Sequence, residues 1–193
     1  MITKGHDFRR ITLVAALNAD SALFSSDFRA PERLFGLLMQ AAGRAGRDGA
    51  RSGHSEMWVQ TWHPRHPLFN ALRKHDYPAF AAQQLAEREQ AGMPPFGYQA
   101  LVRADARTQE AAQAFLASAA AAPGLEGAAS VTLYSAVPMT VQRVANVERA
   151  QMLVESASRG ALQRFLAAWH PVLQATREKG LIRWAVDVDP LAI

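Results

Sequence analysis

The run Gln40–Arg47 (QAAGRAGR) holds the residues of this chain that are best suited to phosphate chemistry. Its two arginines, Arg44 and Arg47, are three positions apart and share one face if the run is helical. A guanidinium group is permanently charged, and its planar fork of donors matches phosphate oxygens. The adjacent Gly43 and Gly46 allow a phosphate or another backbone to come close. The run therefore indicates either a phosphate-binding pair or a basic helix end that suits the negative end of the helix dipole.

The elements around this run are predicted to be a strand, a helix and a second strand. Ile11–Leu17 is a short, nearly continuous apolar run, which is typical of a parallel strand that is buried on both faces. Pro31 opens a helix whose apolar residues recur at helical spacing as far as the arginines. Met57–Trp62 is the expected second strand, and the crossover between the two strands should be right-handed.

The pattern QxxGRxGR resembles the sixth motif of superfamily-two helicases, and the flanking segments narrow this resemblance. Upstream are MITKGHDF at 1–8, ITLV at 11–14 and DSALFSSDFR at 20–29, and downstream are MPPF at 93–96 and WAVDVDP at 184–190. In this order the segments resemble the C-terminal part of the primosomal protein N′ family, the bacterial replication-restart DNA helicases. The resemblance covers essentially the whole chain and is loosest between about residues 104 and 180.

The resemblance implies a place for the arginines in an ATP-binding cleft. Arg44 and Arg47 would reach the γ-phosphate across the cleft between two helicase lobes, with Arg47 as the arginine finger that stabilises the transition state. Gln40, Gly43 and Gly46 would line the same cleft. Several orders of magnitude in turnover can depend on an arginine of this kind.

Lys4, Gly5 and His6 resemble the fifth helicase motif, which in the family couples the nucleotide state to the DNA path. The Gly-Thr-Gln that usually precedes them is missing. The family's phosphate loop, Asp-Glu box, cysteine-rich zinc insert and N-terminal DNA-binding domain all precede the part that this chain resembles. We therefore expect a piece of a longer protein, which would bind ATP and Mg²⁺ and carry zinc in its cysteine-rich region. This piece alone is expected to bind none of them and to hydrolyse no ATP.

The composition supports a domain with a packed core. The 193 residues are 49% apolar, enough for one large domain or two small ones. There is no cysteine, which excludes disulfides and thiolate metal sites. The net charge of +4 and pI near 10.0 permit nucleic-acid binding. No apolar run suits a membrane span and no signal pattern starts the chain, so a cytoplasmic protein is expected. The resemblance implies a bacterial, nucleoid-associated one.

Three histidines, His54, His63 and His66, raise the possibility of a metal site. No carboxylate or cysteine stands at ligand spacing beside them, and Pro64 and Pro67 stiffen the segment. The sequence therefore predicts no metal site.

Three domains are expected. Residues 1–62 would be the C-terminal part of a RecA-like helicase lobe 2, residues 63–95 a helical linker, and residues 96–193 an α+β domain. In the linker, Leu68–His75 and Tyr77–Ala91 are predicted helices that would pack between the lobe and the terminal domain. The fold class is therefore α/β, followed by α+β.

The last domain has the predicted order βαββαβ, which indicates a ferredoxin-like split sheet with both helices on one face. Thr108 and Ser158 are candidate N-caps, and Pro171 is expected to kink or divide the last helix. The predicted strands are Tyr98–Ala104, Val131–Val137, one within Val144–Glu155, and Leu181–Val188, and the predicted helices are Thr108–Ala122 and Ser158–Lys179.

This domain contains no catalytic constellation. Asp187 and Asp189 are interpreted as capping or salt-bridging groups, and Trp169 and Trp184 as core residues, while Tyr134 could stack on a base. A positive surface is expected to contact phosphates, as the family's terminal domain binds branched DNA. It would comprise Arg103, Arg107, Arg143, Arg149, Arg159, Arg164, Arg177 and Lys179.

Arg159 and Gln163 form an i, i+4 pair at the start of a predicted helix. The resemblance implies that they contribute to a pocket for the C-terminal tail of the single-stranded-DNA-binding protein, which is acidic and ends in a carboxylate. The alternative is a pair of solvated helix residues.

The predicted function is the C-terminal portion of an ATP-dependent 3′–5′ DNA helicase that recognises stalled or branched forks and initiates primosome assembly. The expected partners are branched and single-stranded DNA, the tail of the single-stranded-DNA-binding protein and other primosome proteins, but no membrane. The alternatives are a non-hydrolytic DNA-binding or adaptor module and a simple α/β domain of ribosome-associated type. The intact QxxGRxGR favours the helicase, since a non-hydrolytic protein has no evident need for both arginines.

Overall fold

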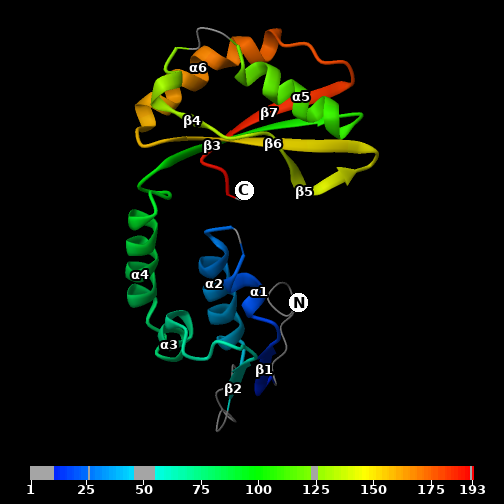
Figure 1. The fold of residues 1–193 in the computed structure, drawn as a ribbon. Helices are drawn as coiled ribbons and strands as arrows, with labels where there is room; N and C mark the ends of the chain where they lie inside the picture. Colours follow the sequence, from blue (N-terminus) through cyan, green and yellow to red (C-terminus); the bar gives the residue numbers. More distant parts are fainter. Residues whose placement is uncertain (1–10, 26, 46–54, 123–125, 192) are drawn as a thin grey trace. The chain divides into compact units, whose positions relative to one another are not determined.

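The computed structural model describes residues 11–25, 27–45, 55–122, 126–191 and 193. The chain divides into two compact units, Met1–Ala86 and Glu87–Leu191, each with its own hydrophobic core (Figure 1). Within the described residues no helix combines the length and the apolar character that crossing a bilayer requires. The chain is a mixed α/β protein.

The first unit contains the predicted strand–helix–strand arrangement. Strands β1 (Leu13–Ala16) and β2 (Glu56–Val59) pair in parallel along their full length, and α1 (Asp20–Leu23) and α2 (Ala30–Ala42) lie between them in sequence. The expectation that the first strand is buried on both faces is wrong. Val14 is 5% exposed, but its neighbour Leu13 is 48% exposed, because the helices of this unit that pack against the strands leave one face of the pair bare.

The core of the first unit forms where α2 meets α3 (Pro67–Arg73) and the start of α4 (Tyr77–Gln90). Pro31 lies in the first turn of α2, as predicted. Phe35 is 1% exposed and stacks on Phe80 with ring centroids 4.2 Å apart. This packing fixes α2, and with it the helix end that carries the predicted phosphate-binding run.

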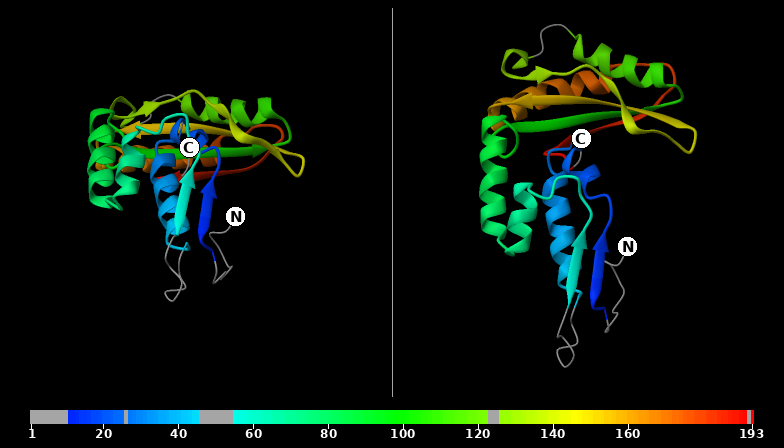
Figure 2. Two further views of the ribbon diagram at one scale, coloured as in Figure 1. Left: turned by 90° about the horizontal axis from the view of Figure 1, so that it is seen from below. Right: turned by 60° about the horizontal axis from the view of Figure 1, so that its bottom comes forward.

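The second unit is an antiparallel sheet with both of its long helices on one face (Figures 1 and 2). The strand order is β4-β6-β3-β7, and β5 also pairs with β6. The strands are β3 (Tyr98–Ala106), β4 (Thr132–Leu133), β5 (Val137–Val144), β6 (Val147–Ser156) and β7 (Leu181–Val188). The helices are α5 (Gln109–Ala120), the 3-10 turn Ala128–Ser130 and α6 (Arg159–Ala175).

Alternate residues of the central strands β3 and β6 face the helices and are buried. Ala100 and Val102 of β3 are 0% exposed and pack against Phe115 of α5 and Trp169 of α6. The indole nitrogen of Trp169 donates a 2.8 Å hydrogen bond to the carbonyl of Ala119. Trp169 is therefore a core residue, as predicted, and is not available for stacking on a base.

Both predicted helix caps of the second unit are present. The Thr108 hydroxyl accepts a hydrogen bond from the amide of Ala111 at 3.2 Å, and the Ser158 hydroxyl accepts one from Ala161 at 3.3 Å. Pro171 lies within α6, and the helix continues to Ala175. The expected division of the helix does not occur.

The region between α5 and β6 differs from the prediction. The strand expected at Val131–Val137 is only two residues long (Thr132–Leu133), and a separate strand, β5, follows it. β5 and β6 form a hairpin whose turn residues, Ala145 and Asn146, have φ of 49° and 64°. This left-handed pair is typical of tight two-residue hairpin turns, in which Gly is the more common residue.

Candidate nucleotide and nucleic-acid sites

The C-terminal end of α2 brings together three of the predicted nucleotide-binding residues. Gln40 is exposed in the last turn, Gly43 follows the helix directly, and Arg44 is half-buried in the turn beyond. The amide of Arg44 donates to the carbonyl of Ala41 at 3.1 Å, which continues the helical path. The other predicted residues of the two motifs lie outside the described residues: Lys4, Gly5, His6, Gly46 and Arg47.

Gly43 does not need to be glycine for the local backbone. Its φ is −66°, in the right-handed region that any residue adopts. A Cβ added there would lie 3.5 Å from the carbonyl oxygen of Met39, an ordinary contact. The helix end itself would therefore tolerate a side chain. As a glycine, Gly43 adds no side-chain bulk beside Arg44.

The segment before α2 is fixed by two carboxylates, which position the helix. Asp20 accepts hydrogen bonds from the Thr61 hydroxyl and from the amide of Trp62 (2.8 Å), so it ties α1 to the end of β2. These hydrogen bonds favour the charged carboxylate and lower the pKa of Asp20. Asp27 accepts from the amide of Arg29 at 2.9 Å and pairs with Arg33 at 2.5 Å. The acidic residues of the DSALFSSDFR segment therefore have a structural role.

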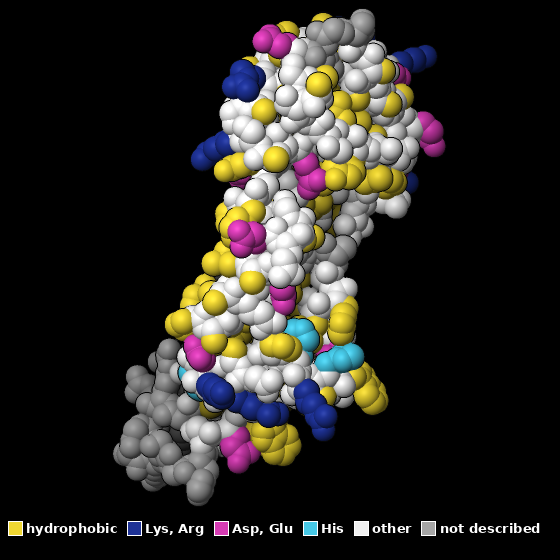
Figure 3. Space-filling model, turned by 60° about the vertical axis from the view of Figure 1, so that its left-hand side comes forward, with side chains coloured by type: hydrophobic (Ala, Val, Ile, Leu, Met, Phe, Trp, Pro, Cys, Tyr) yellow, Lys and Arg dark blue, Asp and Glu magenta, His cyan; other side chains and the backbone are white. Residues whose placement is uncertain are grey.

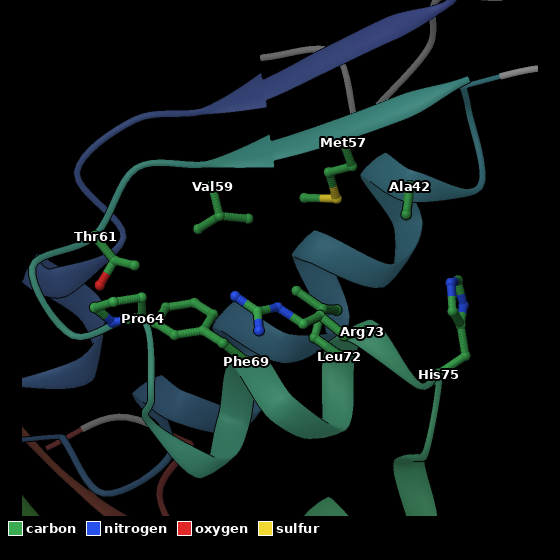
Figure 4. Close-up of a pocket in the computed structure, with 9 residues that line it drawn as sticks. All are labelled: Ala42, Met57, Val59, Thr61, Pro64, Phe69, Leu72, Arg73 and His75. Carbon is green, nitrogen blue, oxygen red and sulfur yellow. The ribbon is translucent and has the colours of Figure 1, made fainter. Parts of the chain in front are cut away.

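A cavity that the sequence did not predict lies beside α2 (Figure 4). It measures about 300 Å³ and has an apolar lining that includes Met57, Val59 and Phe69. The guanidinium of Arg73 extends into it from α3, and His75 lies at another part of its rim. Sequence reasoning misses this cavity because it assigns α3 to a linker.

The surface of the first unit near α3 is basic. Arg65, Arg73 and Lys74 are all exposed there. Figure 3 shows Lys and Arg side chains gathered beside histidines on the first unit. Within the part of the chain that the structure describes, no three His, Cys, Asp or Glu side chains are grouped closely enough to hold a metal ion. His54 lies outside that part.

Part of the positive surface predicted for the second unit is neutralised by ion pairs on the sheet face that its helices leave open. Asp105 of β3 lies between Arg149 of β6 (3.6 Å) and Arg183 of β7 (2.7 Å). Asp187 pairs with Arg103 at 3.3 Å, which confirms its predicted salt-bridging role. Asp189 lies beyond the last strand, and its amide donates to the carbonyl of Gln99 at 2.9 Å.

Tyr134, the candidate for base stacking, and Trp184, the predicted core residue, both contact other side chains of this unit. The Tyr134 hydroxyl donates to the carboxylate of Glu155 at 2.5 Å, and this bond raises the pKa of Tyr134 because the carboxylate holds the phenolic proton. Trp184 is half-buried, packs against the core and meets His170 edge to face at 5.4 Å. Tyr134 alone keeps a substantial exposed surface, at 45%.

Arg159 and Gln163 are both exposed in the first turns of α6, one helical turn apart. Ser158 caps the helix directly before Arg159. The other exposed cations of the predicted positive surface are Arg107, Arg143, Arg164, Arg177 and Lys179. Of these, Arg177 donates a 2.7 Å hydrogen bond to the carbonyl of Gln174, a neutral partner that leaves its charge uncompensated.

Comparison with known proteins identifies the class of this chain. Residues 89–191 match the family described as primosomal protein N C-terminal domain. The chain belongs to this family, which confirms the resemblance carried by the motifs.

The curated relatives are named replication restart protein PriA. The one from Haemophilus influenzae is 40% identical over 191 residues, covering 98% of this chain and 25% of the relative. The one from Synechocystis is 34% identical over 197 residues, covering 100% of this chain and 22% of the relative. The one from Bacillus subtilis is 43% identical over 102 residues, covering 53% of this chain and 12% of the relative. The chain thus spans about a quarter or less of the length of these relatives.

Proposed function

We propose that this chain is the C-terminal portion of an ATP-dependent 3′–5′ DNA helicase that recognises stalled or branched forks and initiates primosome assembly. The names of its relatives support a role in replication restart. The observation that carries the helicase assignment is the end of α2, where Gln40, Gly43 and Arg44 are held together by a packed helix. This is where the sixth helicase motif would present its side chains to a nucleotide.

In this proposal the chain supplies the arginine half of an ATP cleft. Arg47 is the arginine finger, Arg44 assists it, and Gln40, Gly43 and Gly46 line the cleft, while Lys4, Gly5 and His6 couple it to DNA. The phosphate cradle and the Mg²⁺ site of an ATPase would come from another part of the longer protein. The chain alone would therefore hydrolyse no ATP.

The two compact units have matching assignments. The parallel pair β1–β2 with α2 is the remainder of a RecA-like lobe 2, and residues 63–95 link it to the terminal domain. The strand order β4-β6-β3-β7, with both helices on one face, supports a ferredoxin-like terminal domain.

The start of α6 is the proposed contact for the acidic tail of the single-stranded-DNA-binding protein. Arg159 would pair with the terminal carboxylate, and Gln163 would donate a further hydrogen bond from the next turn. An Arg159→Ala variant should bind a tail peptide more weakly than the parent chain, whereas Arg164→Ala should not. Equal affinity of the parent and Arg159→Ala would remove this assignment.

A chimera tests the proposed ATP cleft. The C-terminal region of the Haemophilus influenzae relative is replaced by this chain, which aligns with it over 191 residues. We expect DNA-dependent ATP hydrolysis that falls by at least about a thousandfold on Arg47→Ala. Arg65→Ala removes an exposed arginine outside the motif and should leave hydrolysis unchanged. Retained hydrolysis in the Arg47→Ala chimera would refute the arginine-finger role.

The second candidate is a non-hydrolytic DNA-binding or adaptor module. It is favoured by the family match, which covers residues 89–191 and not the arginine motif. A chimera that is folded and binds DNA, but hydrolyses no ATP, would support this candidate over the helicase.

A further inference from the structure

The β5–β6 hairpin extends past the ends of the strands beside it (Figures 1 and 2). β3 stops pairing with β6 at Ala106, opposite Glu148. The hairpin continues beyond this pair through Val147, the turn Ala145–Asn146 and Val144. Only β6 joins it to the central strand of the sheet. The hairpin from Val137 to Gln151 is called the ribbon below, and the rest of the sheet does not flank its tip, Val144–Val147.

The outer strand of this ribbon is almost entirely exposed. Every β5 residue except Met139 is exposed, including Val141 at 57% and Val144 at 47%. The pairing is irregular between Pro138 and Arg143, where several β5 residues lie opposite a single β6 residue. Bulges of this kind bend and twist a strand and often lie next to functional sites. Exposed valines on an edge strand have no packing role within the described unit.

Positive side chains surround the base of the ribbon. The β3–α5 and α6–β7 loops meet there, because the amide of Arg107 donates to the carbonyl of Gly180 at 2.8 Å. Arg107, Arg177 and Lys179 are exposed on these two loops, and the Arg143 side chain on the ribbon is 63% exposed. Arg149 and Arg183 lie one step further into the sheet. The acidic residues at this end are Asp105, Glu110, Glu148 and Glu178.

Cations outnumber acids at this end, and the paired ones keep donors free. Arg143 holds Glu148 at 3.5 Å through its Nε atom and Asn146 at 2.9 Å through one terminal nitrogen. Arg183 binds Asp105 through Nε, although its side chain is 78% exposed. An arginine has five N–H donors, so both side chains can still bind a phosphate. Their carboxylate partners orient the guanidinium groups.

We propose that this end of the second unit binds a nucleic-acid duplex, with the β5–β6 ribbon in a groove and Arg107, Arg143 and Lys179 on the flanking phosphates. A two-stranded ribbon fits the major groove of B-form DNA. Phosphate contacts from loops on both sides of a groove-binding element set its register. The inference rests on the DNA binding proposed above and specifies which surface carries it.

Salt dependence tests the phosphate contacts. Binding of the full chain to a labelled duplex is measured by anisotropy over a series of salt concentrations. The combined variant R107A/R143A/K179A should bind more weakly, and its slope of log affinity against log salt should fall by about 0.9 for each phosphate that is no longer neutralised. Arg65→Ala, which removes an exposed arginine of the first unit, is the control for the loss of one positive charge. An unchanged slope in the combined variant, with DNA binding intact in the parent, would overturn the inference but leave the proposed DNA binding standing.

Photo-cross-linking tests the ribbon itself. A benzophenone amino acid is placed at Val141 on the ribbon and, as the control, at Ala167 on the exposed side of α6. The inference requires cross-links from position 141 to the labelled duplex, and none from position 167. Cross-links from position 141 to a second copy of the chain, with none to DNA, would identify β5 as a strand-pairing edge and refute the inference. A parent chain that binds no duplex would refute it together with DNA binding by this piece, whereas the ATP cleft is tested separately by the chimera.

Discussion

The sheets of the two units differ in how much of their surface is buried. In the first, β1 and β2 are buried on one face, and Trp58 on the other face is 61% exposed. In the second, β3 is paired on both sides and its residues Ala100 and Val102 are fully buried beneath two long helices. Parallel strands are normally covered on both faces, and sheets usually need at least three strands for independent stability. The difference indicates that the second unit is the more stable of the two in this chain.

The largest expected effect comes from removing one large aromatic side chain from each core. Trp169→Ala and Phe35→Ala should each cost about 3–5 kcal/mol, because both side chains are at most 1% exposed. We expect the second unit to remain folded after Trp169→Ala and the first to unfold after Phe35→Ala. Hydrogen exchange resolved by segment measures both in one chain. If Trp169→Ala abolished protection from exchange in the second unit while Phe35→Ala left the first unit protected, the first unit would be the more stable one.

A smaller effect is expected from the ion pairs on the open face of the second sheet. Asp105→Ala leaves two arginines without their shared acceptor and should cost about 1–3 kcal/mol. Asp187→Ala is the control: its pair with Arg103 is more exposed, so it should cost about 0–1 kcal/mol. Denaturant unfolding of the second unit gives both values. If the two losses were equal, Asp105 would have no special role between β6 and β7.

Gly36→Ala should stabilise the first unit by about 1 kcal/mol. Gly36 lies inside α2, and no atom lies within 4 Å of a Cβ added there. Alanine favours helix over glycine by roughly this amount. Thermal unfolding of the first unit checks the gain, which would narrow the difference between the units. A loss of stability would show that this face of α2 makes a close contact in solution.

The smallest effect concerns pH. The pKa of Asp20 is lowered in the folded state by hydrogen bonds from Thr61 and Trp62, so its stabilising contribution is present above its ordinary value of 3.8. That contribution is lost as the pH falls from 3.8 through the lowered pKa. The stability of the parent relative to Asp20→Asn should therefore decrease below pH 3.8, in the first unit only. A difference that stays constant between about pH 5 and about pH 2.5 would contradict this linkage.

The sequence predicted those elements whose signals are local. Thr108 and Ser158 are caps because a hydroxyl before a helix accepts from the amide three residues on, and β7 was predicted with its observed bounds. The β5–β6 hairpin was missed because its turn is Ala145-Asn146 and not one of the glycine-containing pairs that usually mark such turns.

Features that depend on distant residues could not be predicted. Asp105 and Arg183 are far apart in the chain, and only the register of β3 against β7 brings them together. The exposed face of β1 also could not be predicted, because an apolar run does not show whether helices pack on one face of the strand or on both. In the candidate ATP site, the motif identified Gln40, Gly43 and Arg44, but their arrangement follows from the packing of α2 on α3 and α4.

The way the ribbon is attached has a consequence for how this domain can be altered. β5 pairs only with β6, and its residues contribute little to the core. Changes at the tip should therefore have little effect on the stability of the domain. Exposed loop tips of this kind tolerate insertions and exchanges of sequence. A different tip could therefore be grafted between Thr140 and Val147 without rebuilding the helix-covered sheet.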